Sequence, residues 1–402
     1  MLPRVVHGGG RLVGVDVARA VALLGMMATH ILRPVDATGE LAWPQALAGG
    51  RASALFAVLA GVSMALVTGG PDPHRGERRL ADAGGLLTRA VVIGVLGLWL
   101  GALDTPVAVI LTYYALLFVL GLPFLGLRAP ALLALGAAWL LLAPVVSHAV
   151  RAATTPSGPT VPTLEAASSL PAVLADLLLT GYYPAFPWLA YLLVGLGLGR
   201  LHLGRPGTAA LVAACGAAAA GLAWVVSLAL TSVPAVQESL VATSDTASTW
   251  DQLRHTLGLG LHGTTPTGSW WWLAVVAPHS GTPADLLHTT GTAAAVLGVS
   301  LLAARLRPRV WAVAFGAGAM TLTLYTLHVV MLQPAFWPGP GAEVWLRHAS
   351  LALAIGAVVA AAGRRGPLEA VVRRASDGTA GLVLGASGGA RQAGGTDRGL
   401  SG

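Results

Sequence analysis

The amino-acid sequence predicts an all-α integral membrane protein, a polytopic bundle of about ten transmembrane helices with both termini in the cytoplasm. Composition is the first reason, because 55% of the 402 residues are hydrophobic and 10% are charged. Ordinary soluble domains have roughly 25% charged residues. The mean hydropathy of +0.72 agrees with a membrane protein. The other two reasons are the lengths of the apolar stretches and the positions of the arginines.

Ten apolar stretches approach the length of about 20 residues with which a helix crosses the hydrocarbon layer. In chain order they predict helices at residues 12–32, 52–69, 86–103, 106–127, 129–150, 182–200, 207–232, 284–304, 309–332 and 346–363. The first stretch contains charged residues and no A-x-A-like cleavage site, so we expect a retained helix rather than a signal peptide.

These stretches divide the chain into three parts. Residues 12–363 form the predicted transmembrane domain, which follows a cytoplasmic N-terminal segment at residues 1–11. Residues 364–402 form a cytoplasmic tail. This tail is rich in Gly, Ala and Ser without a sustained apolar face, so we expect it to be largely disordered from about residue 375.

The arginines support the helix count and set the orientation. The chain has 24 arginines and no lysine, and such cations concentrate in the cytoplasmic loops of membrane proteins. With the N-terminus inside, 18 of the 24 arginines fall in inner links or in the C-terminal tail. This bias predicts a multi-pass protein of the plasma membrane, and the Ala-, Gly- and Arg-rich composition suggests a bacterial source. Because the arginines lie mostly in short links, the net charge of +7 does not indicate nucleic-acid binding.

The first predicted helix carries three ionisable residues. Arg19 and His30 are eleven residues apart, so they share a helix face and lie about 16 Å apart along its axis. Asp16 precedes Arg19 by about one turn and can pair with it. A structural ion pair with an interfacial histidine explains this pattern about as well as a functional site does.

Eight of the eleven histidines lie at outer helix ends or in outer loops in this topology. Histidine takes and returns a proton near neutral pH, so the bias predicts a polar site at the outer face. No pair has the H-x-x-x-H spacing of a helical zinc site, and the lone Cys215 offers no thiolate cluster. We therefore expect no metal.

Two outer elements resemble parts of a site. In "PHSGTPADLLHTTG", the start of a helix and the hydroxyls of Ser280 and Thr282 could hold an anion or a developing oxyanion, although Asp285 could instead cap the helix. In "GAMTLTLYTLHVVML", one face carries Thr321, Tyr325 and His328. Such a stripe faces protein or water, and interhelical hydrogen bonding explains it about as well as catalysis does.

The sixth predicted helix begins with "TGYYPAFPWLAY", in which Pro184 and Pro187 interrupt regular structure beside Tyr183. Breaks of this kind occur within a membrane only where they are buried or line a cavity. We therefore expect catalysis by His30, His328, His279 and Asp16, and substrate or cofactor contacts by Arg19, Ser280, Thr282, Tyr325, Tyr183 and His288.

These motifs resemble a known group of membrane acyltransferases. Asp16 with the Arg19-x10-His30 pair resembles the signature of the acyltransferase-3 type. The segment "RLVGVDVARAVALLGMMATHI", followed by "ALFAVLAGVSMAL", is similar to the heparan-alpha-glucosaminide N-acetyltransferase-like domain. The segments "GYYPAFPWLAYLLVGLGLGR", "PHSGTPADLLHTTG" and "LTLYTLHVVML" look like later parts of the DUF418 (YeiB-like) bacterial membrane proteins. The similarity runs from about residue 11 to residue 363.

The resemblance implies transfer of an acetyl or acyl group from cytosolic acetyl-CoA to an amine or hydroxyl acceptor at the outer face, such as a hexosamine or another glycan. Arg19 would contact the CoA donor. His30 would act as a general base or as a nucleophile that carries the acetyl group. The chain departs from the lysosomal enzymes, whose proposed active histidine lies in the loop after the first helix.

Two other functions remain open at this point. A transporter for a small polar solute would use Asp16, Arg19 and the histidines as a proton relay, although no internal repeat indicates a transporter built from two halves. A non-catalytic membrane scaffold is the other alternative. The lipid bilayer is the one partner that the sequence predicts directly, and it leaves open the acceptor, the acyl chain and assembly into a homo-oligomer.

Overall fold

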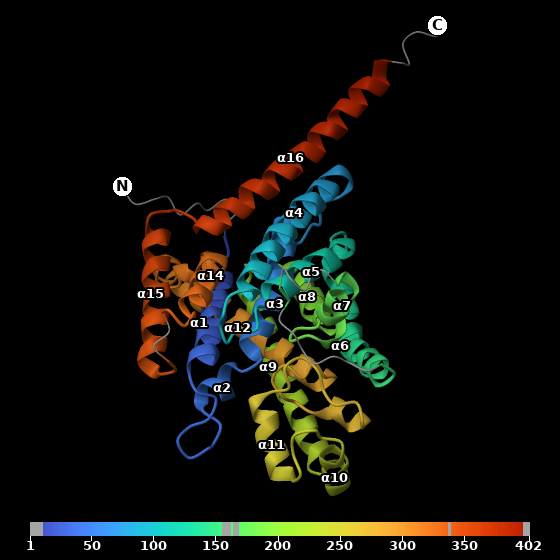
Figure 1. The fold of residues 1–402 in the computed structure, drawn as a ribbon. Helices are drawn as coiled ribbons and strands as arrows, with labels where there is room; N and C mark the ends of the chain where they lie inside the picture. The colour runs from blue at the N-terminus through green and yellow to red at the C-terminus, as the bar shows by residue number, and fades with distance from the viewer. Residues whose placement is uncertain (1–10, 155–161, 164–168, 337–338, 397–402) are drawn as a thin grey trace.

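The computed structural model describes residues 11–154, 162–163, 169–336 and 339–396. Within those ranges every regular element is a helix, which confirms the all-α prediction. Figure 1 shows a helical bundle with the short helices α10 and α11 at one end and the long helix α16 at the other.

The helices follow one another along the whole described chain. They are α1 Val13–Ile31, α2 Trp43–Ala48, α3 Arg51–Val67, α4 Gly76–Gly101, α5 Leu111–Gly121, α6 Ala129–Ala152, α7 Leu170–Ala175, α8 Ala185–Gly199, α9 Pro206–Thr231, α10 Pro234–Ala242, α11 Trp250–Leu259, α12 Pro283–Leu306, α13 Pro308–Ala314, α14 Thr321–Met331, α15 Ala342–Ala361 and α16 Pro367–Thr396. Shorter helical turns are η1 Leu122–Phe124, η3 Asp176–Thr180, η4 Trp270–Ala274 and η5 Gly316–Ala319.

Seven helices of the described chain are long and apolar enough to cross a membrane. They are α1, the segment Trp43–Val67 that contains α2 and α3, α4, α6, α9, α12 and α15. An eighth span results if Pro171–Thr180 and Ala185–Gly199, which meet at an angle of 58°, count as one broken span. The chain is thus a multi-pass membrane protein. The count of ten spans is not confirmed.

Two of the predicted spans contain shorter helices than expected. The stretch 106–127 forms α5 and η1, and the stretch 309–332 is divided among α13, η5 and α14. The second break brings η5 against the backbones of two neighbouring helices. A Cβ at Gly318 would overlap the carbonyl group of Asp16 on α1, and a Cβ at Gly316 would overlap that of Gly356 on α15. Close backbone packing therefore replaces a regular helix here.

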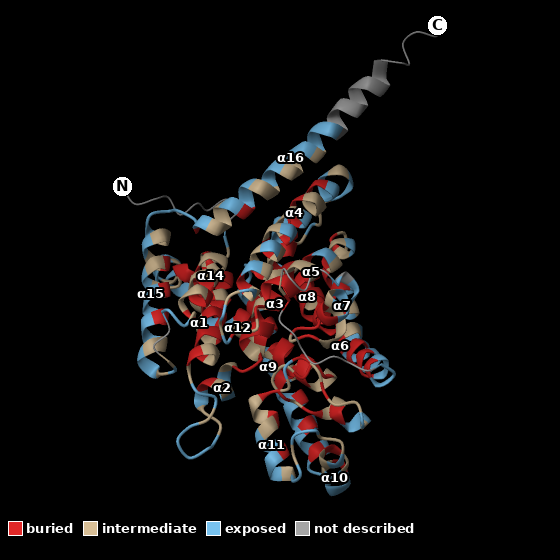
Figure 2. Cartoon of the chain, in the orientation of Figure 1, coloured by how far each residue is buried: buried red, intermediate tan, exposed pale blue. Residues whose placement is uncertain are grey.

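The buried part of the bundle centres on α1, α3, α8 and α12, as Figure 2 shows. Helix α9 packs on α12 at very short range, since a Cβ at Gly291 would lie 2.6 Å from the carbonyl oxygen of Gly216. Small residues allow such close contacts between membrane helices. The outward face of α9 exposes Leu211 and Leu222, and that of α4 exposes Val91 and Val95, as suits helices in contact with lipid.

Helix α16 is a correction to the predicted tail. The sequence predicts disorder from about residue 375, but α16 continues to Thr396. Its residues Ser376 and Thr379 pack against Gly85 and Gly84 of α4, and the Thr88 hydroxyl donates to the Thr379 hydroxyl at 2.8 Å. The glycines of α4 allow this close contact, and the composition of the tail alone does not reveal it.

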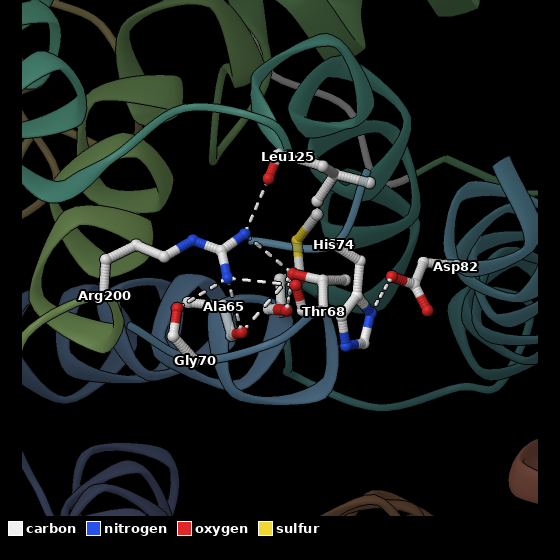
Figure 3. Close-up of polar contacts among 8 residues, drawn as sticks. Ala65, Thr68, Gly70, His74, Asp82, Leu125 and Arg200 are labelled. Atoms are coloured by element: carbon white, nitrogen blue, oxygen red, sulfur yellow. Dashed lines mark hydrogen bonds and ion pairs between the residues drawn. The ribbon is translucent and has the colours of Figure 1, made fainter. Parts of the chain in front are cut away.

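One buried arginine, Arg200, joins several helix ends through polar contacts (Figure 3). The guanidinium of Arg200 donates to the carbonyl oxygens of Ala65, Thr68, Gly70 and Leu125 at 2.9, 3.1, 2.8 and 2.7 Å. It also donates to the Thr68 hydroxyl at 2.9 Å. This network holds the end of α3 and the turn after α5 on the end of α8.

Candidate active site

A cavity of about 680 Å³ lies between α1, α3, α4, α5, α14 and α16. Its volume falls in the range of about 300–1,000 Å³ that is typical of small-molecule sites. Residues of α16, including Arg373 and Ser376, line one part, whereas Met26 of α1 and Tyr325 of α14 line another. Arg19 and Met26 are seven residues apart on α1, so the cavity extends at least about 10 Å along that helix. It is thus an elongated site with polar and apolar regions.

Arg89, like Arg365, lines this cavity without an ion pair among the described residues, and the carboxylate of Glu369 attracts it only from beyond ion-pair distance. Its Nε is buried without a hydrogen-bond partner, and its guanidinium carbon lies 5.4 Å from the centre of the Phe118 ring. Arg373, by contrast, pairs with Asp377 at 3.1 Å. A buried charge without a partner is costly in a protein interior. Arg89 therefore indicates that the cavity is built for an anionic ligand.

Asp16 and Arg19 form the ion pair that their spacing predicts, with Arg19 Nη1 donating to Oδ1 of Asp16 at 3.0 Å. Arg11 donates to Oδ2 of the same carboxylate at 2.5 Å. The other terminal nitrogen of Arg19 donates to the hydroxyl of Ser63 on α3. Asp16 is thus enclosed by two arginines and acts on Arg19 by positioning it, while Arg19 itself lines the cavity.

Three histidines meet beyond the apolar part of the cavity. Nδ1 of His30 on α1 lies 3.1 Å from Nε2 of His328 on α14, and the two ring planes are nearly parallel, at 10°, with centroids 5.4 Å apart. Nδ1 of His328 lies 3.0 Å from Nδ1 of His348 on α15. His328 and His348 are buried. His30 follows Met26 by four residues and His328 follows Tyr325 by three, so the cluster is about one helical turn from the cavity lining.

A group of aromatic residues adjoins these histidines. His279 stands in the loop before α12 with a φ of 58°, stacks on Trp188 and meets the edge of Tyr183 at a centroid distance of 5.4 Å. Burial lowers the pKa of His279 to about 4, with smaller contributions from His262 and His30. The His279 ring is therefore neutral near pH 7, and Tyr183 and His279 form an aromatic wall beside the cluster.

Ser280 and Thr282, the predicted anion site, belong to a helix cap in the structure. Thr282 caps α12, because its hydroxyl accepts from the backbone N–H of Asp285 at 3.0 Å. Asp285 in turn accepts from the backbone N–H of Gly281 at 3.2 Å, and Ser280 donates towards Thr282 at 3.5 Å. A carboxylate thus occupies the start of the helix. These residues have a capping arrangement in place of the expected oxyanion site.

His288 also has a structural arrangement rather than a place in the histidine cluster. Its Nδ1 lies 3.0 Å from the carbonyl oxygen of Ala220 on α9, and its Nε2 accepts from Arg51 Nε at 3.1 Å. Both ring nitrogens are therefore occupied. This histidine joins α12 to α9 and α3.

Three residues of the site were not selected from the sequence. His348 counts among the outer histidines, but only the packing of α15 on α14 brings it to His328. Arg89 lies within an apolar run, and no local spacing singles it out. Glu369 belongs to the tail that the sequence predicts to be cytoplasmic, yet its carboxylate accepts from the backbone N–H groups of Leu322 and Thr323 at the start of α14.

The described residues contain no group of three or more His, Cys, Asp or Glu side chains arranged to hold a metal ion. In the histidine cluster, the ring nitrogens that face one another are at hydrogen-bond distance. The arrangement suits proton exchange between imidazoles.

Comparison with known families gives one match. The family model described as heparan-alpha-glucosaminide N-acetyltransferase, catalytic, matches residues 11–232, which is more than half of the chain. The comparison with curated proteins gives no match. The matched part includes Arg19, His30 and Arg89, and it contains four of the helices that line the cavity, α1, α3, α4 and α5. The chain therefore belongs to the family of the heparan-alpha-glucosaminide N-acetyltransferase catalytic domain.

Proposed function

We propose that this protein transfers an acetyl group from cytosolic acetyl-CoA to an amine or hydroxyl of a hexosamine or related glycan at the outer face of a bacterial plasma membrane. The observation that carries the proposal is the cavity, which contains a buried arginine without an ion pair among the described residues and ends about one helical turn before His30. Membership of an N-acetyltransferase family supports the type of reaction. The arginine distribution supports a cytoplasmic location for both termini and for α16.

The donor fits the cavity in one orientation. Arg365 and Arg373 lie on the part lined by α16, where they would meet the phosphates of the nucleotide, and Arg89 lies deeper. Arginine binds phosphate through paired, charge-assisted hydrogen bonds. The thioester end would then lie among Met26, Tyr114 and Tyr325, in the apolar part of the cavity that is nearest to the histidines.

The transfer breaks the carbon–sulfur bond of the thioester and forms a carbon–nitrogen or carbon–oxygen bond to the acceptor. CoA leaves as its thiolate, and the attacking amine or hydroxyl loses one proton. His30 can take that proton directly as a general base. Alternatively its imidazole attacks the thioester first and carries the acetyl group to the acceptor. Both routes place His30 between donor and acceptor, and both leave Arg19 and Asp16 as groups that position the donor.

The experiment uses purified protein in lipid nanodiscs with radiolabelled acetyl-CoA and a series of hexosamines. We expect acceptor-dependent formation of labelled product and of free CoA. His30→Ala should lower kcat by about 10²- to 10⁴-fold, the usual contribution of an acid–base group. The matched control is His255→Ala, since His255 is an exposed histidine whose Nε2 lies 3.0 Å from the Gly39 carbonyl oxygen. This control should retain wild-type activity.

Two results would redirect the proposal. Product formation that survives His30→Ala removes His30 as the catalytic group. Absence of transfer with every hexosamine, together with solute uptake into vesicles, favours a transporter. The 58° bend between Pro171–Thr180 and Ala185–Gly199 is the feature that favours this second candidate, because broken helices form substrate sites in transporters.

A further inference from the structure

General-base catalysis requires one histidine, but the cluster contains three. His30, His328 and His348 come from three different helices, and two contacts of 3.1 and 3.0 Å connect them in a row. Within the described residues, neither contact uses Nε2 of His30 or Nε2 of His348. The row therefore has one ring nitrogen at each end that is available to another group.

The contacts fix how protons can be distributed along this row. When all three rings are neutral, each ring carries one N–H. If His30 donates from Nδ1 to His328, then His328 must donate from its own Nδ1 to His348, and His348 carries its proton on Nε2. In this arrangement Nε2 of His30 is an acceptor. It is the arrangement that allows His30 to take a proton from a substrate.

The two ends of the row differ in their surroundings. His30 lies next to the apolar end of the cavity. It also lies close enough to His279 of the aromatic wall to affect that residue electrostatically. His348 lies in the second turn of α15, beside the exposed Arg347, which pairs with Glu343 at 3.4 Å. The start of α15 belongs to the outer end of the bundle in the orientation that the arginines indicate. The row thus leads from the reaction site towards the outer surface.

We infer that His30, His328 and His348 form a proton relay that delivers the proton of the acceptor to the outer face during acetyl transfer. This inference rests on the proposed function. The acceptor O–H or N–H gives its proton to Nε2 of His30 as its oxygen or nitrogen bonds to the acetyl carbon. His30 passes its Nδ1 proton to His328, His328 passes its Nδ1 proton to His348, and His348 releases its Nε2 proton to water.

This sequence of steps leaves every ring neutral, in the opposite tautomer, and rotation of the rings restores the start without taking a proton back from the outer side. The CoA thiolate takes its proton from the cytoplasmic side. Each acetyl transfer therefore adds one proton to the outer side and removes one from the inner side. Direct proton transfer from the acceptor to the CoA thiolate would change neither side.

Sealed vesicles separate the two possibilities. Protein is reconstituted with a pH-sensitive dye and one acceptor in the lumen, N-acetylglucosamine in one preparation and glucosamine in another, and labelled acetyl-CoA is added outside. Because acetyl-CoA is impermeant, only molecules with their cytoplasmic side outward react. For a hydroxyl acceptor the relay predicts one lumenal proton per acetyl group transferred, whereas direct proton transfer to CoA predicts none. For an ammonium acceptor the relay predicts two lumenal protons and direct transfer predicts one, since one proton already leaves on formation of the free amine.

His348→Ala should lower kcat by at least about tenfold without changing KM for acetyl-CoA, since His348 is not among the residues that line the cavity. Imidazole added to the lumen should restore part of the rate, whereas His348→Gln, which keeps a polar side chain but cannot relay, should remain slow. His255→Ala is the control for loss of an outer histidine.

Each result has a distinct meaning. Transfer without the additional lumenal proton, or a His348→Ala protein within twofold of wild-type kcat, overturns the relay and leaves the proposed function intact. A His348→Gln protein that recovers the full rate shows that His348 only positions His328, and also overturns the relay. Absence of any transfer by the wild-type protein overturns the proposed function and the relay together.

Discussion

Replacement of Arg89 by methionine tests the donor site, because it should weaken acetyl-CoA binding and leave the stability of the folded protein unchanged. The Arg89 guanidinium lines the cavity, its Nε has no hydrogen-bond partner among the described residues, and Phe118 is the ring beneath it. Methionine keeps much of the apolar volume of the side chain and removes the charge. If a phosphate of the donor is the missing partner, the substitution should weaken the donor complex without weakening the folded protein.

The size of this effect follows from the interaction that is lost. A hydrogen bond to a charged group contributes about 1.5–3 kcal/mol, and each 1.4 kcal/mol corresponds to about tenfold in affinity. Arg89→Met should therefore raise KM for acetyl-CoA by about 10- to 100-fold. Because the described residues offer Arg89 no ion pair, the thermal unfolding midpoint should not fall. Arg89→Lys keeps a positive charge but not the planar fork of the guanidinium. Its KM for acetyl-CoA should therefore lie between the values for the wild-type protein and Arg89→Met.

The assay is steady-state acetyl transfer at varied acetyl-CoA, with thermal unfolding measured on the same preparations. The matched control is Arg309→Met, an exposed arginine outside the cavity, which should change neither quantity. An unchanged KM in Arg89→Met would refute the assignment of the cavity as the donor site. A lower unfolding midpoint with an unchanged KM would show that Arg89 has a structural role instead.

Three further predictions concern the surroundings of the site. Arg200→Met should lower the free energy of unfolding by about 3 kcal/mol or more, because it removes a charged donor from the Thr68 hydroxyl and from the carbonyl oxygens of Ala65, Thr68, Gly70 and Leu125; an unchanged unfolding midpoint would contradict this. Thr282→Ala should cost about 0.5–2 kcal/mol as a lost helix cap, with kcat retained, whereas a large loss of kcat at full stability would restore the oxyanion interpretation. His279 has a pKa lowered to about 4, below the value of about 6.5 in an unfolded chain. Its contribution to stability is therefore complete above pH 6.5 and is lost as the pH falls towards 4, by up to about 1.4 kcal/mol per pH unit. His279→Asn should flatten this dependence in unfolding measurements, and an unaltered slope would assign it to other groups.

The sequence was most informative where a local pattern leads to one physical outcome. Apolar length predicted the seven helices that are long enough to cross a membrane, and the i, i+3 spacing of Asp16 and Arg19 predicted an ion pair that the structure contains. The polar stripe of α14 does face protein, with Tyr325 and His328 both buried. The close contact of His30 with His328 joins two of the predicted catalytic residues, although 298 positions separate them. No local spacing could establish that distance.

Local patterns failed where one motif has two outcomes. A Ser or Thr before a helix is equally the start of an anion site and a helix cap, and the carboxylate of Asp285 decides for the cap. The predicted span 309–332 is broken where Gly316 packs against α15 and Gly318 packs against α1. Local sequence does not show these contacts. Composition also misjudged the tail, because Ser376 and Thr379 of α16 pack closely against Gly84 and Gly85 of α4, a contact that the tail's own composition does not reveal.

Arg89 and His348 show what only tertiary packing reveals. Each lies in an apolar sequence without a partner at helical spacing. Arg89 becomes conspicuous because the surrounding helices enclose it and leave its Nε without an acceptor. His348 becomes conspicuous because α15 lies against α14. The donor site and the relay are therefore properties of the fold.

Movement of an acetyl group from one side of the bilayer to the other is the most direct test of the proposed function. Acetyl-CoA labelled in the acetyl group is supplied outside sealed proteoliposomes, and hexosamine is enclosed in the lumen. We predict labelled acetylated sugar in the lumen and free CoA outside in equal amounts, at a rate that Arg89→Met and His30→Ala both lower. Lumenal sugar that remains unlabelled while acetyl-CoA stays intact outside would contradict transmembrane acetyl transfer.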